Sequence, residues 1–471
     1  MNRATLPFDL ETLDKIHTLS LEILREVGVR FHGEGALVEF RKHGFRVENQ
    51  MVFMNEDQID QALASAPPHF VVKARNPDLN MVVGRNEHVM APGYGPPFVI
   101  EPSGEKRNAL LDDVHKFCKL VQTSKCLDFN SSIIVQPSDV PQATAHLDVI
   151  AAALTLTEKP IMGSSGSADA ARDSLRLAEM VFGNLNEPVM ISLVDSLSPL
   201  QYSNDSADAL MIHAAAGQPV IIHSACTMGA TGPITLAGSL VASNAATLAG
   251  ICLAQLIRPG APVVYGLGGT PLEMRTGGYI NASPEDAKHA AIAAAMGRYY
   301  NLPSRSQGAL TEAFCLDYQA GMESAVMMTT AAISGANVTL HACGTYGSML
   351  AMSYHKFLAD EDLIGSLRKL TAPIELTDEA LALDLIKKLG VSGNYLTEKH
   401  TASRCRSEFF MPDLGIRVNH DHWLGMEPRD YTARADRLLD KRLNEYIQPD
   451  IDPALEKEIE SFILSRKKEA K

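Results

Sequence analysis

The chain has 471 residues, of which 46% are apolar and 21% charged, a composition typical of a folded globular protein and not of a disordered or fibrous one. Its formal net charge of -14 at pH 7 argues against nucleic acid or an anionic membrane surface as a partner, because both would repel a face of that sign. The seven cysteines show no CxxC spacing, which indicates neither a disulfide framework nor a zinc ribbon and favours a reducing cytoplasm.

Residues 1–90 predict an N-terminal addition of helices and short extended pieces. Amphipathic helices are expected at residues 9–28 and 55–66, because apolar side chains recur there every three or four positions. Acidic residues interrupt the apolar positions of the first helix, and no uninterrupted apolar run along the chain approaches the length of a bilayer span. The sequence therefore predicts neither an export signal nor a membrane-spanning helix.

Residues 91–372 alternate short apolar segments with longer Ala- and Leu-rich ones. Helices are expected at residues 141–158, 168–184, 236–257, 283–300 and 317–335. Strands are expected near residues 97, 128, 159, 188, 219, 262, 304 and 337. Apolar strands between helices indicate parallel βαβ units, and eight such units predict a (β/α)8 TIM barrel of the α/β class. An open doubly wound sheet is the alternative, but its nucleotide-binding motifs GxGxxG and GxxxxGK[ST] do not occur in the chain.

Residues 373–471 predict a further helical segment with charged faces. No linker rich in Ser, Gly or Pro separates either terminal addition from the barrel, so we expect both to pack on it. Helices added at both ends of the chain also favour self-association into a homo-oligomer.

In a barrel of this kind, functional side chains lie where the strands end and the loops to the next helices begin. The residues expected there are Tyr94, Phe98, Asn130, Ser164, Ser165, Asp195, His223, Cys226, residues 265–269, residues 307–312 and residues 341–346. Aromatic rings and carboxylates gathered at a barrel mouth would attract a cation such as a quaternary ammonium group, which also fits the negative net charge.

The same strand ends carry residues that could bind a metal ion. His223, Cys226, Cys315, His341 and Cys343 are of the types that bind zinc, which needs three or four ligands converging on one point. They have no motif spacing, however, and free cysteines are commonly buried in protein cores. The pattern therefore favours ordinary core positions, with a zinc site as the alternative.

The stretch GALTEAFCLDYQAGMESA, residues 308–325, gathers four acidic or amide side chains near one turn. Asp317 is expected to cap the helix that follows, and Glu323 to lie near its first turn, where the helix dipole favours a negative charge. These roles leave Glu312 and Gln319 unexplained. We therefore expect part of this stretch to belong to the ligand site.

Four longer segments carry a family resemblance. They are APGYGPPFVIEPSGEKRNALLDDVHKFCKL, LDYQAGMES, ISGANVTLHACGTYGSMLAMSYHKFLADEDLIG and FFMPDLGIRVNHDHW. Together they resemble the trimethylamine methyltransferase superfamily, and within it the members without pyrrolysine, which are similar to glycine betaine, proline betaine and carnitine methyltransferases. The resemblance implies a TIM barrel that moves a methyl group from a quaternary amine to Co(I) of a corrinoid held by a separate protein. It implies no metal in the chain itself.

The resemblance and the strand-end positions together assign expected roles to the aromatic residues. We expect Tyr94, Phe98 and Tyr346 to form aromatic walls around the quaternary ammonium group. We expect His341 to anchor a substrate carboxylate or an adjacent carboxylate side chain.

The acidic stretch completes the expected site. We expect Glu312 and Asp317 to supply negative potential and Gln319 to fix the loop. One alternative is a zinc-dependent corrinoid methyltransferase that acts on methanol or a methylamine through the His and Cys residues. Another is a betaine-binding protein without catalytic activity.

Overall fold

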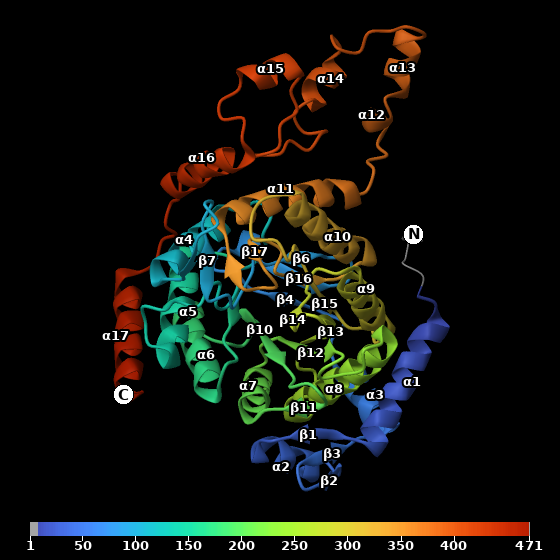
Figure 1. The fold of residues 1–471 in the computed structure, drawn as a ribbon, viewed down its shortest axis with the longest axis vertical. Coiled ribbons are helices and arrows are strands. Elements are labelled where there is room, and N and C mark those ends of the chain that lie inside the picture. The colour runs from blue at the N-terminus through green and yellow to red at the C-terminus, as the bar shows by residue number, and fades with distance from the viewer. Residues whose placement is uncertain (1–7, 471) are drawn as a thin grey trace.

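The computed structural model describes residues 8–470, so the first seven residues of the predicted N-terminal addition and residue 471 lie outside the described residues. Figure 1 shows a curled parallel sheet at the centre, with helices on its outer face and helical segments at both ends of the chain. The protein therefore has a mixed α/β fold.

Within residues 8–470, seven strands form the parallel path of the central sheet, in the order β6-β16-β15-β13-β12-β10-β9. These strands are β6 (Val89–Met90), β9 (Ile161–Gly163), β10 (Met190–Asp195), β12 (Val220–Met228), β13 (Val263–Glu273), β15 (Ser304–Gln307) and β16 (Val338–Leu340), and a short strand, β14 (Gly278–Tyr279), pairs with the end of β13. Between the two edge strands, the Asp128 N–H donates to the Met90 carbonyl (2.9 Å) and Asn130 forms a parallel bridge with Ile161. The sheet therefore curls until residues 128–130 connect its edges.

The strand predicted near residue 97 was expected to belong to this sheet, and that prediction is wrong. The segment does form β7 (Phe98–Ile100), but β7 belongs to a separate small sheet with β8 (Lys106–Asn108), β17 (Thr345–Tyr346) and β18 (Ala351–Met352). Its expected place beside β16 is taken by β6, which has only two residues and so shows no periodicity that a sequence pattern could detect. The strands predicted near residues 159, 188, 219, 262, 304 and 337 are confirmed.

Eight helices in the described chain cover the outside of the sheet. They are α4 (Leu111–Thr123), α5 (Ala145–Leu156), α6 (Ala168–Phe182), α7 (Asn204–Ala215), α8 (Leu236–Ile257), α9 (Pro284–Tyr299), α10 (Tyr318–Ser334) and α11 (Tyr354–Thr371), with short 3-10 turns η1 (Pro77–Leu79) and η2 (Gln142–Thr144). Side chains of Ser167, Ser203, Thr235, Ser283 and Asp317 accept hydrogen bonds from first-turn N–H groups of α6 to α10. These caps explain why the helices begin where they do.

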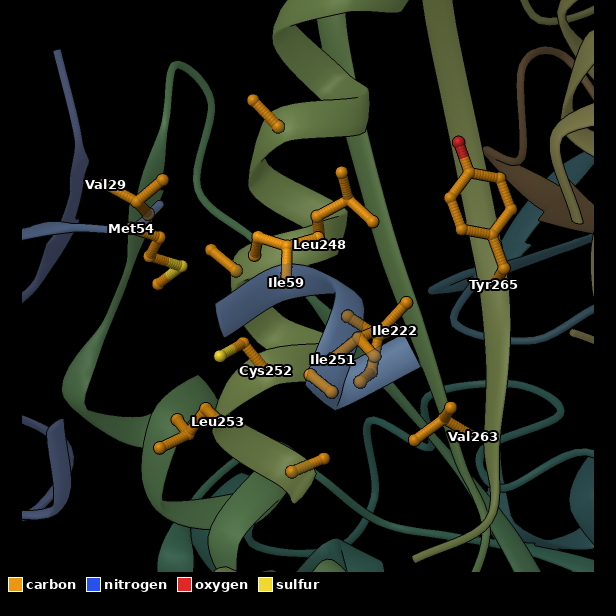
Figure 2. Packing of buried hydrophobic residues seen from close by; sticks show 14 of the residues in the cluster. Val29, Met54, Ile59, Ile222, Leu248, Ile251, Cys252, Leu253, Val263 and Tyr265 are labelled. Atoms are coloured by element: carbon orange, nitrogen blue, oxygen red, sulfur yellow. The ribbon is translucent and has the colours of Figure 1, made fainter. Parts of the chain in front are cut away.

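Helix α8 is long and apolar enough to cross a bilayer, but most of it is buried in the fold. It packs between strands β12 and β13 on one side and the N-terminal elements on the other. Figure 2 shows this packing, in which the α8 residues Leu248, Ile251, Cys252 and Leu253 lie among Ile222, Val263, Val29, Met54 and Ile59. The apolar surface of α8 is therefore accounted for by the core.

The N-terminal region adds two small sheets and three helices. Its elements are α1 (Leu10–Glu26), β1 (Val29–Phe31), α2 (Glu34–Lys42), β2 (Arg46–Glu48), β3 (Met51–Phe53), α3 (Glu56–Ser65), β4 (His69–Val72) and β5 (Met81–Gly84), and β11 (Gln201–Tyr202) joins the sheet of β1 to β3. The β4–β5 hairpin inserts Phe70 and Met81 into the same apolar cluster as Ile191 and Val264 inside the central sheet. This hairpin closes the end of the sheet at which the strands begin, so a ligand must enter where the strands end.

The C-terminal region divides into a packed part and a projecting part. Its helices are α12 (Asp378–Leu381), α13 (Leu383–Leu389), α14 (Lys399–Arg404), α15 (His420–Gly425), α16 (Tyr431–Asn444) and α17 (Pro453–Glu469). Helix α16 packs on α11 and α4, and α17 packs on α5 and α6. Residues 373–425 instead extend away from the sheet and its helices (Figure 1), unlike the packing that we expected of the whole segment.

Candidate active site

Three strands place Asp195, His223 and Arg305 at one level inside the curled sheet. The register pairs Asp195 with His223, His223 with Gly266, and Gly266 with Arg305. The Asp195 Oδ1 atom lies 2.6 Å from His223 Nδ1, and His223 Nε2 lies 3.0 Å from Arg305 Nη1. Because a guanidinium can only donate, His223 Nε2 accepts from Arg305, and Nδ1–H donates to Asp195. The arrangement therefore fixes His223 as one neutral tautomer.

The electrostatic surroundings keep Asp195 ionised and His223 neutral. Burial, followed by the positive charge of Arg305, lowers the pKa of His223. Burial opposes ionisation of Asp195, but the His223 hydrogen bond and the charge of Arg305 outweigh it, so the pKa of Asp195 lies below its ordinary value. Although the Asp195 carboxyl lies deep in the fold, 59% of its side-chain surface is accessible. A carboxylate is thus presented to the interior of the sheet.

Tyr94 and His341 form an aromatic pair beside these residues. Their rings stack with centroids 4.4 Å apart and planes inclined by 26°. Tyr94 is half-buried and lies near the Arg305 guanidinium, whereas His341 is only 1% exposed. Burial and the Arg305 charge lower the pKa of His341 to about 3, so its ring is neutral at pH 7. This burial places His341 behind Tyr94 and leaves Tyr94 as the ring at the opening.

The backbone at His341 is strained. Its φ of 56° lies in the left-handed region, which costs a non-glycine residue about 1 kcal/mol or more. The His341 N–H donates to the Pro92 carbonyl (3.3 Å), and the next residue, Ala342, donates to Ala91 (2.8 Å). These bonds to the loop that carries Tyr94 hold the two rings together and support the strained conformation.

Gly268 in β13 allows the His223 ring to occupy its position. A Cβ atom at this glycine would lie 2.8 Å from His223 Nε2, the atom that accepts from Arg305. We expect Gly268→Ala to displace the His223 ring and to weaken its hydrogen bond with Arg305. A hydrogen bond to a charged group contributes about 1.5–3 kcal/mol, so kcat/KM for the reaction proposed below should fall about 10-fold. Steady-state kinetics with Gly321→Ala as the control checks this, because no atom lies within 4 Å of a Cβ at Gly321. Equal kinetics for the two variants would contradict it.

The acidic stretch predicted from the sequence forms a separate cluster at the rim. Glu323 accepts from the Thr311 hydroxyl (2.6 Å), from the Glu312 N–H (2.8 Å) and from the Gln319 amide (3.0 Å). Glu312 accepts from the Ser348 hydroxyl (2.6 Å), and burial raises the pKa of Glu312.

Two further bonds complete the rim cluster. The Asn281 N–H donates to Glu312 (2.7 Å), and Asp317 caps α10 by accepting from the Ala320 N–H (2.9 Å). The stretch therefore ties together the loops that follow β13, β15 and β16. Glu312, Gln319 and Glu323 therefore link segments at the rim of the opening, whereas Asp317 caps α10.

Of the three predicted aromatic walls, the structure places only Tyr94 beside Asp195. Tyr346 is almost fully buried, in a small apolar cluster with Ile100 and Ala351, and Phe98 packs against that cluster. The Lys106 ammonium lies 4.3 Å from the centroid of the Phe98 ring. Phe98 and Tyr346 thus belong to the small sheet that flanks the opening.

Sequence reasoning missed Arg305 and Asp286. Arg305 is 2% exposed, and its Nε atom has no hydrogen-bond partner. Asp286, in α9, is also buried with one unpartnered carboxylate oxygen, and burial raises its pKa despite the nearby Arg305 charge. The available signal was the segment SRSQ itself, because a charged residue within a buried parallel strand requires a partner.

The residues considered as zinc ligands do not converge. Both ring nitrogens of His223 are engaged, the Cys226 thiol lies 2.8 Å from the Ser239 hydroxyl, and Cys315 is exposed at the surface. Within residues 8–470, no three His, Cys, Asp or Glu side chains lie close enough together to hold a metal ion.

Comparison with known proteins places this chain in a family. The trimethylamine methyltransferase (MTTB) family model matches residues 2–471. The chain is 37% identical over 463 residues to the glycine betaine methyltransferase of Desulfitobacterium hafniense (strain Y51), covering 98% of this chain and 96% of that protein. It is 33% identical over 454 residues to the proline betaine:corrinoid methyltransferase of Eubacterium limosum, covering 93% of each.

A solved structure shares the fold. The Methanosarcina barkeri monomethylamine methyltransferase (MtmB) aligns with a TM-score of 0.52 and 13% identity, over 93% of this chain and 88% of that one. At this identity the likeness concerns the fold alone, and it agrees with the curled parallel sheet described above. The sequence matches extend over nearly the whole chain. The chain therefore belongs to the trimethylamine methyltransferase (MTTB) family.

Proposed function

We propose that the protein transfers a methyl group from a quaternary amine of the betaine class to a corrinoid carried by a separate protein. The observation that carries this proposal is the ionised, accessible Asp195 carboxylate beside the Tyr94 ring, at the end of the sheet where the strands finish. Both relatives named above act, by their names, on betaines.

The site matches the charge distribution of a betaine. A quaternary ammonium group is attracted by the Asp195 carboxylate and by an aromatic face such as that of Tyr94, which contributes about 0.5–2 kcal/mol. Arg305, at the same level of the sheet, supplies a positive potential that favours the carboxylate of the substrate. The pair of opposite charges therefore suits a zwitterion better than a simple cation such as choline.

The chemistry requires little activation by the protein. When the N–CH3 bond breaks, its electron pair stays on nitrogen and a neutral tertiary amine leaves, so no proton has to be donated. The corrinoid, brought by its carrier protein, supplies the nucleophile that accepts the methyl group. This chain orients the methyl group toward the opening and keeps water away from it. The β4–β5 hairpin supports the second role by closing the other end.

The rim of the opening fits a protein partner. Large apolar side chains on the loops after β10, β12, β13 and β15 are exposed there, namely Leu197, Ile234, Met274, Tyr279 and Phe314. An exposed apolar rim of this kind is typical of protein interaction sites. We propose that the corrinoid carrier protein docks on it. The described cysteines are all free, which fits the reducing cytoplasm that a Co(I) acceptor needs.

We further infer that the curled sheet is a closed (β/α)8 barrel, with residues 128–130 as its eighth strand. The hydrogen bond from Asp128 to Met90 and the bridge from Asn130 to Ile161 support this closure. Closure would place Asn130 among the strand ends that face the ligand, where its Oδ1 atom has no partner in the described chain.

The proposed activity is tested by mixing the purified protein with Co(I) cobalamin and glycine betaine, proline betaine or carnitine. We expect methylation of the cobalamin, followed by absorbance, with at least one of them. Binding by calorimetry without methylation, in the presence and absence of a cognate corrinoid protein, would favour the alternative of a non-catalytic betaine-binding protein.

His341 is proposed as a positioning residue that supports Tyr94. We expect His341→Ala to raise KM about 10-fold with a smaller change in kcat, because an aromatic pair contributes about 0.5–1.5 kcal/mol. His341→Phe keeps the stacking and is expected to restore KM. If the imidazole instead anchors the substrate carboxylate, as the sequence suggested, the Phe variant will be as impaired as the Ala variant. An unchanged KM in both variants would assign His341 to the core.

The pH dependence follows from the groups around Tyr94. The pKa of His341 is about 3, and the pKa values of His223 and Asp195 lie below their ordinary values. Both imidazoles are therefore neutral and Asp195 is ionised from pH 7 to pH 8, and a quaternary ammonium group has no proton to lose. We expect kcat/KM to be flat over this range and to fall only at a pH below the ordinary histidine value of 6.5, where protonation of His223 repels the substrate. A step between pH 7 and pH 8 would contradict this assignment.

A further inference from the structure

Residues 373–425, which we call the C-terminal arm, expose an unusual amount of apolar surface. Leu414 is the one buried residue of the arm. Nearly half of the large apolar side chains that are exposed among residues 8–470 lie in it, namely Ile374, Leu376, Leu381, Leu383, Ile386, Val391, Tyr395, Leu396, Phe409, Met411, Ile416, Val418, Trp423 and Leu424. Monomeric proteins rarely leave such a surface uncovered.

The arm is nevertheless anchored to the rest of the chain. Asp362 of α11 accepts hydrogen bonds from the backbone N–H groups of Asp413, Leu414 and Gly415, at 2.7 to 2.9 Å. Within the arm, Arg404 pairs with Glu375 at 3.0 Å. The arm therefore has a defined path, and its apolar side chains lack a cover in the single chain.

Helix α10 carries a second uncovered apolar face on the same side of the molecule. Tyr318, Met322, Val326 and Ile333 are all exposed, Tyr318 by 83%, and their spacing places them along one side of the helix. We call these four residues the α10 stripe. Glu323 is the one charged residue of α10, and its carboxylate is bound by the rim cluster. The outward face of an ordinary surface helix would be polar.

The arm and the stripe lie next to each other in the fold. Helix α11 packs against α10 and leads directly into the arm, and Figure 1 shows the arm beyond these two helices. A groove of about 560 Å³ separates α10 and α11 from the base of the arm at residues 412–417. An apolar segment and an apolar receiving surface are therefore both present at one end of every chain.

We propose that two copies of the chain exchange their arms, so that the arm of each copy covers the α10 stripe of the other. A two-fold axis lets the arm and the α10 stripe of both copies be covered at once, so neither surface is left to bind further copies. The exposed arm residues and the stripe together approach the 20–30 residues per side, roughly, of a standard protein interface. The arm holds six basic and eight acidic residues, so the net charge of -14 is not concentrated where the copies meet.

The proposal is independent of the enzymatic activity and is tested by oligomeric state. Two double variants place acids in the interface, Met322→Glu with Val326→Glu in the stripe and Leu396→Glu with Phe409→Glu in the arm. Val38→Glu on α2, at the opposite end of the molecule, is the matched control. By light scattering after size exclusion at micromolar concentration, we expect dimers for the wild type and the control and monomers for each double variant.

Mixing the two double variants provides the sharper test. The stripe variant keeps an intact arm and the arm variant keeps an intact stripe, so one of the two contacts can form again. We expect the mixture to contain dimers that neither variant forms alone. Dimers that depend on contacts between two arms would not be restored in this way. Circular dichroism spectra that match that of the control, together with a cooperative melting transition, show that the variants are folded; loss of the dimer itself can lower the melting temperature.

Three results would overturn the proposal. A monomeric wild type would mean that the arm folds back on its own chain. A stripe variant that stays dimeric would place the partner's arm elsewhere. A stripe variant that stays dimeric and methylates free cobalamin, but fails with the carrier protein, would assign the stripe to the corrinoid protein.

Discussion

Replacing Asp195 with asparagine is expected to weaken glycine betaine binding about 100-fold. The substitution keeps the shape of the side chain and an oxygen that can accept from His223 Nδ1–H, so the hydrogen bond seen at 2.6 Å can persist. It removes the negative charge that faces the permanent charge of the substrate, and loss of one partner of a desolvated charge pair costs about 2–5 kcal/mol. Calorimetry measures the dissociation constant, and cobalamin methylation measures kcat/KM.

A control separates the local charge from the overall charge of the protein. Asp205→Asn removes one acid from the exposed first turn of α7, outside the sheet. We expect this variant to bind glycine betaine as the wild type does. If Asp195→Asn also binds normally, the quaternary ammonium group does not sit beside Asp195, and the assignment of the site is wrong.

Replacing Arg305 with methionine is expected to have the largest effect on both stability and activity. The guanidinium donates to His223 at 3.0 Å and lies near Tyr94, and Arg305 is only 2% exposed. Without it, the negative charge of Asp195 loses its nearby positive partner. The hydrogen bond from the guanidinium to His223 is lost as well, and a hydrogen bond to a charged group contributes about 1.5–3 kcal/mol. Urea unfolding should show a loss of that order in the free energy of unfolding.

A titration distinguishes the electrostatic role of Arg305 from simple packing. The Arg305 charge helps to lower the pKa of His223, so in Arg305→Met that pKa should move upward, toward the ordinary value of 6.5. The proton resonances of the imidazole, followed by NMR against pH, measure this shift. We also expect the variant to lose more affinity for glycine betaine than for choline, because choline has no carboxylate. An unchanged His223 pKa with equal losses for both ligands would reduce Arg305 to a packing residue.

The long elements of the fold were predictable because they carry a strong periodic pattern. The predicted helix at 236–257 coincides with α8, and the nine-residue strand β12 overlaps the predicted segment near 219. The two-residue strand β6 was not predictable, because two residues show no periodicity. The more apolar segment that forms β7 was predicted to belong to the sheet instead. The pairing of such short strands depends on contacts with β16 that are distant in the sequence.

The position of the site was more predictable than the roles of its residues. The end of β10 locates Asp195 at the opening, because the strand pattern itself fixes which residue comes last. His223 lies within the longer strand β12, and the register of the two strands places it beside Asp195. The aromatic walls depended on the paths of loops, and these turn Phe98 and Tyr346 into a separate apolar cluster. Arg305 lies within a strand whose four residues are all buried, so its position in the sequence indicates the core and not a functional site.

The hairpin β4–β5 has a kinetic consequence. Because it closes one end of the sheet, substrate and product must pass through the same opening at the other end. Under the proposed function, the carrier protein covers that opening during the reaction. The amine must be loaded before the carrier arrives, and the demethylated amine can escape only after the carrier departs. Initial-rate patterns should therefore show a compulsory order, with the corrinoid protein arriving second and leaving first.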